Sequence, residues 1–279
     1  MLSTKLKIVI ATLVQRVINI FYNDVSNICV FRKGLYWNLN LKEGIDFSIF
    51  MFGYFEKETT KVLDRLLRKG HVVIDIGANI GAHTMHMAQI VGDEGKVYVV
   101  EPTNYALNKL ENNIAINPAI SSRIVVKHLL LVSKHNISKK ISGIYSSWPL
   151  ESVKGKHHVH CGVKMSISGV EKNTLDNMVL GQKITKIDVI KLDVDGNELD
   201  VLIGGQKSII KFKPVFVMEL APDQYEKNSD FDKTIQLMSS MGYEFYPLNE
   251  VTKYPDDSTL LRNLIPDMGS INIIAKIKV

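Results

Sequence analysis

Residues 72–81 read VVIDIGANIG, and this stretch decides the fold of the chain. Its first half is a continuous apolar run interrupted only by Asp75, which is typical of a buried strand in a parallel sheet. Gly77 and Gly81 follow in a short loop, and residues 80–91 have the apolar spacing of a helix. A glycine-rich turn between a strand and a helix lets the backbone approach a ligand closely. We therefore expect a ligand-binding loop here.

The alternation of strand and helix continues through most of the chain. Apolar runs and helical spacing predict strands at 96–100, 124–128, 188–192 and 215–220, helices at 59–68, 104–116, 198–210 and 231–241, and a closing β pair at 243–246 and 271–277. Strand–helix–strand units are right-handed and place their strands parallel. The sequence therefore predicts an α/β fold with a doubly wound, mostly parallel, Rossmann-like sheet that carries helices on both faces.

Three regions follow one another along the chain. Residues 1–22 have the spacing of an amphipathic helix, which we expect to pack on its own domain or a second copy, or to lie on a membrane surface. Its uncharged run is too short to span a bilayer. Residues 23–56 predict a small β-rich lead-in, and residues 57–279 the main domain. An insertion at about 133–170 interrupts the alternation.

The composition excludes several classes of protein. The 279 residues include 34 basic and 29 acidic side chains, a net charge of +5, and the basic residues are scattered rather than gathered into a stripe. A dedicated nucleic-acid binder is therefore not expected. Cys29 and Cys161 lie too far apart in sequence for a disulfide framework, and a reducing compartment suits them. We expect a cytoplasmic location, with membrane association left open.

The loop also indicates the chemistry of its ligand. Asn79 stands where a dinucleotide-binding loop has its second glycine, and the carboxylate of Asp75 would repel a pyrophosphate. Both features argue against a nicotinamide-dependent dehydrogenase. S-adenosylmethionine has no phosphate, and a carboxylate can orient its ammonium directly or through water. Glu101, twenty residues after Gly81 at the tip of the next strand, can accept both ribose hydroxyls.

Longer motifs resemble a known family, the FkbM-type methyltransferases. The resemblance runs from GYFE (53–56) to Glu219 and includes VIDIGANIGAHT, VYVVEPT, KLENNIAINP, NTLDNM, VIKLDVDGNELDVLIGG and KPVFVMEL. The family usually has glutamate where this chain has Asp195. It implies a class I S-adenosylmethionine-dependent enzyme that O-methylates a hydroxyl of a sugar, a polysaccharide or a small metabolite.

The resemblance also implies which residues contact the cofactor. They are Asp75, Gly77, Ala78, Asn79 and Gly81 at the loop and Glu101 at the second strand, with the adenine near Leu129 or Leu130.

Three carboxylates are the candidates for catalysis. Ligands of open α/β sheets bind beyond the carboxyl ends of the strands, where Asp193, Asp195 and Glu219 are expected. Residues two apart point the same way in an extended chain, so Asp193 and Asp195 could share one hydroxyl or one divalent metal ion. Two close carboxylates raise one pKa, and we expect Asp193, with its pKa raised by Asp195, to act as the general base. Alternatively, residues 195–197 form a turn that caps the next helix. We assign no metal ligand.

Other features keep further interpretations open. His157, His158, His160 and Cys161 are dense, but their spacing fits no standard zinc site, and we expect a solvated loop. Trp148 could stack on a sugar or pack on the sheet. We expect a glycan or small-molecule acceptor and no nucleic acid. The competing functions are an RNA methyltransferase and a non-catalytic module that binds the cofactor.

Overall fold

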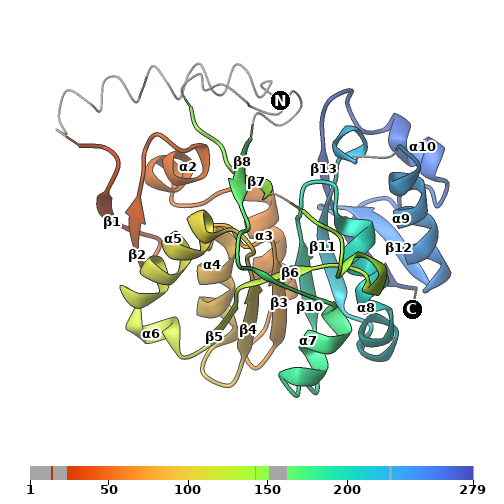
Figure 1. Ribbon diagram of the computed structural model, residues 1–279, viewed down its shortest axis with the longest axis horizontal. Helices are drawn as coiled ribbons and strands as arrows, with labels where there is room; N and C mark the ends of the chain where they lie inside the picture. The colour runs from red at the N-terminus through yellow and green to blue at the C-terminus, as the bar shows by residue number, and fades with distance from the viewer. Residues whose placement is uncertain (1–13, 15–23, 142, 151–161, 226–227, 279) are drawn as a thin grey trace.

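The computed structural model describes residues 14, 24–141, 143–150, 162–225 and 228–278 (Figure 1). The predicted helix over residues 1–22 lies outside these ranges, apart from Val14, and its membrane contact stays a prediction. The histidine and cysteine cluster at 157–161 also lies outside the described residues. No helix within the described ranges combines the length and the apolar character needed to cross a bilayer.

A seven-stranded sheet forms the centre of the molecule, in the order β12-β13-β11-β10-β3-β4-β5 (Figure 1). Its strands are β3 (Val72–Ile76), β4 (Lys96–Val100), β5 (Ile124–Lys127), β10 (Val189–Leu192), β11 (Val215–Leu220), β12 (Tyr243–Pro247) and β13 (Ile271–Ile277). β13 runs antiparallel to both of its neighbours, and the other pairs are parallel. The predicted mostly parallel sheet is confirmed.

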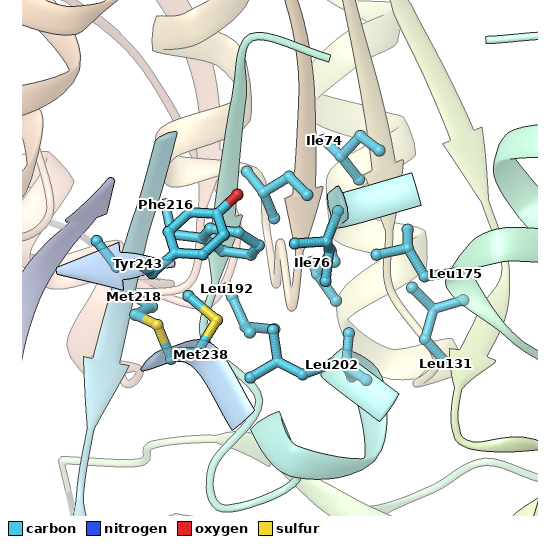
Figure 2. Packing of buried hydrophobic residues seen from close by; sticks show 14 of the residues in the cluster. Ile74, Ile76, Leu131, Leu175, Leu192, Leu202, Phe216, Met218, Met238 and Tyr243 are labelled. Atoms are coloured by element: carbon cyan, nitrogen blue, oxygen red, sulfur yellow. The ribbon is translucent and has the colours of Figure 1, made fainter. Parts of the chain in front are cut away.

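Helices cover both faces of the sheet, as a doubly wound fold requires. One face carries α7 (Leu175–Gly181), α8 (Glu198–Phe212), α9 (Asn228–Ser240) and α10 (Ser258–Asn263), and the other carries α3 (Lys57–Leu66), α4 (Ala82–Val91), α5 (Asn104–Ala115) and α6 (Pro118–Ser121). β3 shows how side chains divide between the faces. Ile74 and Ile76 pack toward Leu175 and Leu202, as Figure 2 shows, whereas Val73 joins the core on the α4 face.

The lead-in contains a helix that the sequence did not predict. Strands β1 (Ile28–Arg32) and β2 (Leu35–Leu39) form an antiparallel pair within the expected β-rich lead-in, but α2 (Gly44–Phe52) follows them. Its aromatic and β-branched residues are typical of a strand, and tertiary contacts override that preference. Asp46, 1% exposed, accepts a hydrogen bond from the Asn40 backbone and pairs with Lys109 at 2.7 Å. These contacts fix α2 against the main domain.

The insertion adds short elements beside the carboxyl ends of the central strands. It contains a 3₁₀ turn, η1 (Lys134–Asn136), and the antiparallel pair β7 (Gly143–Ser147) and β8 (Val163–Ser166). Flanking it, β6 (Leu129–Leu131) pairs in parallel with β9 (Glu171–Asn173). Ser146 ties β7 to the glycine loop, because Asn79 Nδ2 donates to its carbonyl at 3.1 Å.

Candidate active site

A cavity of about 730 Å³ opens at the carboxyl ends of β3 and β10. The strand order reverses between these two strands, since the chain proceeds from β3 toward β5 and later from β10 toward β11. Such a switch point is where open α/β sheets bind their ligands. The loop after β3, helix α2 and strand β7 complete the walls. The volume lies within the roughly 300–1,000 Å³ of small-molecule sites.

The glycine loop forms one edge of this cavity through Gly77, Ala78 and Asn79. The backbone N–H groups of Gly77 and Ala78 donate to the carbonyl of Val100 at 3.0 and 3.3 Å. Gly77 has a φ of +82°, and a Cβ added there would lie 1.8 Å from the backbone oxygen of Asp193. The loop therefore requires glycine at this position to pack against the residue that follows β10.

Asp75 and Gly81 lie behind the loop and are not among the residues that line the cavity. Asp75 is fully buried, and Thr84 Oγ1 donates to its Oδ2 at 2.6 Å. The alternation along β3 directs its side chain toward α4, where it also neighbours Lys191 across the strand pair. Asp75 therefore does not reach the surface of the cavity, and its part in cofactor binding stays a prediction. Gly81, at a φ of +90°, starts α4.

Glu101 lines the cavity from the tip of β4, as the sequence predicted for a ribose ligand. Its Oε2 accepts from the Asn79 backbone at 3.0 Å, and its Oε1 accepts from the Thr103 N–H and hydroxyl at 2.9 and 2.6 Å. Burial raises its pKa, and these hydrogen bonds oppose the rise. A carboxylate has about four lone-pair sites, so two further hydroxyl donors can still reach it.

An apolar wall faces the loop where the sequence placed the adenine. Leu130, 8% exposed, lines the cavity together with Leu129 and Leu131 of β6. Val100 and Pro102 extend the apolar surface beside Glu101. A flat heterocycle could lie against this wall while its sugar reaches the carboxylate.

The three predicted catalytic carboxylates come together beside the glycine loop, at the ends of β10 and β11. One oxygen from each of Asp193, Asp195 and Glu219 lies within 4.8 Å of the others. Burial raises the pKa of Asp195 well above its usual range, and the charge of Asp193 adds to the rise. Burial likewise raises the pKa of Glu219, with Asp193 and Asp195 contributing. The raised values suit a general base near neutral pH.

The turn predicted at residues 195–197 is also present. Asp195 and Gly196 have φ values of +50° and +94°. Glu198 Oε1 accepts from the backbone N–H groups of Val194 and Gly196, both at 3.3 Å. Glu198 therefore holds the turn in place, and the carboxylate of Asp195 faces the cavity.

Three titratable residues of the cavity wall escaped the sequence analysis as site residues: Glu56, His83 and Lys191. Lys191, 4% exposed, lies 3.1 Å from Asp193 Oδ2. Burial favours its neutral form, but Asp193, Asp75 and Glu56 outweigh that effect and raise its pKa. The lysine within the apolar strand β10 was the one signal for it. Glu56 lies within GYFE and His83 within VIDIGANIGAHT, but neither residue was given a role from the sequence.

Large apolar residues, most of them aromatic, line another part of the cavity. They are Phe47, Met51 and Phe52 of α2, Phe55, and Trp148, which follows β7. Glu43 Oε2 accepts a hydrogen bond of 2.8 Å from the Trp148 backbone N–H, which anchors this segment to the start of α2. The stacking of Trp148 on a sugar stays a prediction.

A doubly wound sheet, with a glycine loop after β3 and an acid at the tip of β4, defines an α/β protein that binds a nucleoside-containing ligand at its switch point. The chain belongs to the FkbM methyltransferase family, whose domain, described as "Methyltransferase FkbM domain", matches residues 75–245. The resemblance seen in the sequence is confirmed.

Among characterised proteins, the hexuronic acid methyltransferase AglP of Haloferax volcanii is 28% identical over 149 residues, which cover 53% of this chain and 56% of that protein. The chain thus matches little more than half the length of this relative.

Two solved structures show weaker likenesses. A methyltransferase FkbM from Methylobacillus flagellatus is 14% identical, with 83% of this chain and 59% of that chain covered and a TM-score of 0.44. An S-adenosylmethionine-dependent O-methyltransferase from Thermotoga maritima is 12% identical, with 94% and 82% covered and a TM-score of 0.43. Both TM-scores are below 0.5, so neither likeness bears on the site.

Proposed function

We propose that this protein is an S-adenosylmethionine-dependent methyltransferase that O-methylates a hydroxyl of a sugar or related metabolite. One observation carries the proposal. One cavity at the switch point is lined both by the glycine loop and Glu101 and by the Asp193, Asp195 and Glu219 carboxylates. Family membership supports the same activity.

The residues of the cavity fit the cofactor. Glu101 suits the ribose hydroxyls, the leucines of β6 suit the adenine, and the loop at Gly77 permits close backbone approach. The carboxylates of Asp193, Asp195 and Glu219 suit a ligand that carries a sulfonium and an ammonium and no phosphate. When bound, the cofactor supplies a methyl group already activated by its positive sulfur.

The carboxylates supply what an alcohol acceptor needs. The protein must hold the acceptor oxygen in line with the methyl group, about 3 Å away, and take its proton. Asp195 and Glu219 have raised pKa values and face the cavity, so either could receive that proton. Asp193 would orient the acceptor through its fixed contact with Lys191. The same three carboxylates also have the ligand chemistry of a divalent cation.

The charge of the site limits the class of acceptor that can bind. AglP is named for a hexuronic acid, which supports a sugar acceptor for its relative. In this chain, however, three carboxylates crowd the cavity and its buried lysine is already paired with Asp193. An anionic sugar would be repelled, whereas neutral hydroxyls can donate hydrogen bonds to these oxygens. We therefore favour a neutral sugar hydroxyl. The same repulsion disfavours RNA as the acceptor.

Two measurements test the function. Titration calorimetry of the full chain should show binding of S-adenosylhomocysteine and none of NAD. Transfer of radiolabelled methyl groups to a panel of oligosaccharides should then label neutral sugars in preference to matched uronic acids. Binding of NAD alone would refute the assignment as a methyltransferase. Efficient labelling of the uronic acids alone would refute the neutral acceptor but not the methyltransferase activity. Binding of the cofactor without transfer to any class of acceptor would favour a non-catalytic module.

A further inference from the structure

His83 is a buried, unsatisfied group on the wall of the cavity. It is 5% exposed, and neither ring nitrogen has a hydrogen-bond partner among the residues that the structure describes. Its Nε2 lies 3.5 Å from Glu56 Oε2, longer than a usual hydrogen bond. A buried polar group without a partner is costly. Because the imidazole lines the cavity, a ligand there can satisfy it.

His83 sits in the first turn of α4, a helix of ten residues. Gly81 occupies the N-cap position and offers no side chain to cap the first turn. The free N–H groups and the helix dipole make such an end attractive to an anion. Ala82 and His83 both line the cavity, so this helix end is open to a ligand within it.

Glu56 supplies the opposite charge beside His83. It lines the cavity at the start of α3 and is 26% exposed. Burial disfavours its ionisation, but His83 and Lys191 outweigh burial and lower its pKa to about 2. The side chain is therefore an anion. It also takes a hydrogen bond of 3.2 Å from Thr59 Oγ1, which holds it in place. An anion and a cation-forming group thus stand side by side on one wall.

We propose that Glu56 and His83 form the subsite for the amino-acid end of S-adenosylmethionine. Glu56 accepts hydrogen bonds from the ammonium, and His83 holds the carboxylate together with the first-turn N–H groups of α4. This inference rests on the proposed function. It assigns to Glu56 the contact with the ammonium that we expected of Asp75, whose carboxylate accepts a hydrogen bond from Thr84 outside the cavity lining.

The other charged groups of the cavity are less suited to the carboxylate. The ammonium of Lys191 already pairs with Asp193 at 3.1 Å. Asp193, Asp195 and Glu219 offer no cation, and each of them repels a carboxylate when it is ionised. His83 and the end of α4 are therefore the best match for a carboxylate among the described residues of the wall.

Two ligands that differ in the amino-acid end measure the contribution of this subsite to binding. S-adenosylhomocysteine carries the amino-acid end, and 5′-methylthioadenosine has the same nucleoside and thioether without it. Titration calorimetry of the full chain should show that Glu56→Gln and His83→Leu each weaken binding of S-adenosylhomocysteine at least about tenfold, as loss of a charged hydrogen bond does. Binding of methylthioadenosine should change less than about twofold. His83→Gln, which keeps a donor, should recover part of the loss.

His86 provides the matched control. It lies on the same helix and pairs with Asp64 at 2.9 Å, but it does not line the cavity. His86→Leu should therefore leave both affinities unchanged. Thermal melting of each variant shows whether it folds. Equal weakening of both ligands by the Glu56 and His83 variants, or no weakening of either, overturns the inference. Wild-type protein that binds neither ligand overturns the proposed function as well.

Discussion

Gly77 and Asp193 are in direct backbone contact across the ends of β3 and β10, so closely that a Cβ on Gly77 would lie 1.8 Å from the Asp193 carbonyl oxygen. The N–H of Asp193 also donates to the Ile76 carbonyl at 3.1 Å. The glycine loop after β3 and the turn after β10 are therefore fixed to one another. A shift in either segment moves both halves of the site.

Gly77→Ala should destabilise the protein by more than about 3 kcal/mol, because the added methyl group must displace backbone. Gly169→Ala is the matched control. Gly169 has a similar φ of +79°, yet nothing lies within 4 Å of its added Cβ. It should lose only about 1–2 kcal/mol, the cost of the left-handed conformation itself. Urea denaturation measures both. Equal losses of unfolding free energy in the two variants would show that the backbone at Gly77 and Asp193 can move apart at little cost.

Glu101→Gln should weaken binding of S-adenosylhomocysteine by about 1.5–3 kcal/mol, the usual contribution of hydrogen bonds to a charged group. The amide keeps one acceptor oxygen but cannot take both ribose hydroxyls. Titration calorimetry with a 2′,3′-dideoxy analogue provides the comparison, since wild type and variant should bind that ligand alike. If the variant prefers S-adenosylhomocysteine over the dideoxy analogue as strongly as wild type does, Glu101 does not bind the ribose hydroxyls.

The sequence predicted the sheet well because its strands are continuous apolar runs between glycine or proline signals. β4, β11 and β13 lie where they were expected. Helix α2 was missed, since its buried Asp46 and aromatic residues make sense only beside Lys109 and the main domain. Such contacts join residues far apart in sequence, and no local pattern indicates them.

The site was predicted in the same uneven way. Strand ends are readable from sequence, so Glu101 and the cluster of Asp193, Asp195 and Glu219 were placed in the cavity correctly. The direction of a side chain at a strand end is not readable in the same way. The alternation along β3 sends Asp75 under α4, and the fold instead brings Glu56 and His83 to the wall from separate segments. Only their three-dimensional proximity reveals the pair.

Glu219→Gln should stabilise the protein at pH 8 and have little effect at pH 4. Burial and the neighbouring aspartates raise the pKa of Glu219 in the folded state above its unfolded value. The ionised carboxylate of Glu219 therefore destabilises the folded state at pH values above the folded pKa, because burying its charge costs free energy. This penalty fades as pH falls through the folded pKa and is absent below the unfolded value. Thermal melting across pH measures the difference.

Glu244→Gln is the control of opposite sign. Its partly buried carboxylate has a pKa lowered by hydrogen bonds from Lys253 and Tyr246. Its stabilising effect is present above the unfolded pKa and is lost as pH falls through the folded pKa. The variant should therefore be slightly less stable than wild type at pH 8. Destabilisation by Glu219→Gln at pH 8 would mean that its contacts outweigh the cost of its charge.

Asp195→Asn and Asp193→Asn should bind S-adenosylhomocysteine almost normally and transfer methyl groups at least tenfold more slowly, within the roughly 10²–10⁴-fold range for loss of a general base. The pH profile separates their roles. Turnover by wild type should rise with pH through a pKa above that of an ordinary carboxyl group, because the pKa of Asp195 is raised and the base must be ionised. Asp195→Asn should lose that rise, and Asp193→Asn should keep it.

The same cluster allows a metal-dependent alternative, which a chelator distinguishes from a proton-transfer role. If the carboxylates act as bases, EDTA should leave wild-type turnover unchanged, because proton transfer to a carboxylate needs no ion. If they hold a divalent cation within their 4.8 Å spacing, EDTA should reproduce the loss seen in the variants, and added Mg²⁺ or Mn²⁺ should restore wild type only. Normal turnover by both variants with the true acceptor would exclude both roles, because neither carboxylate would then be needed for the chemical step.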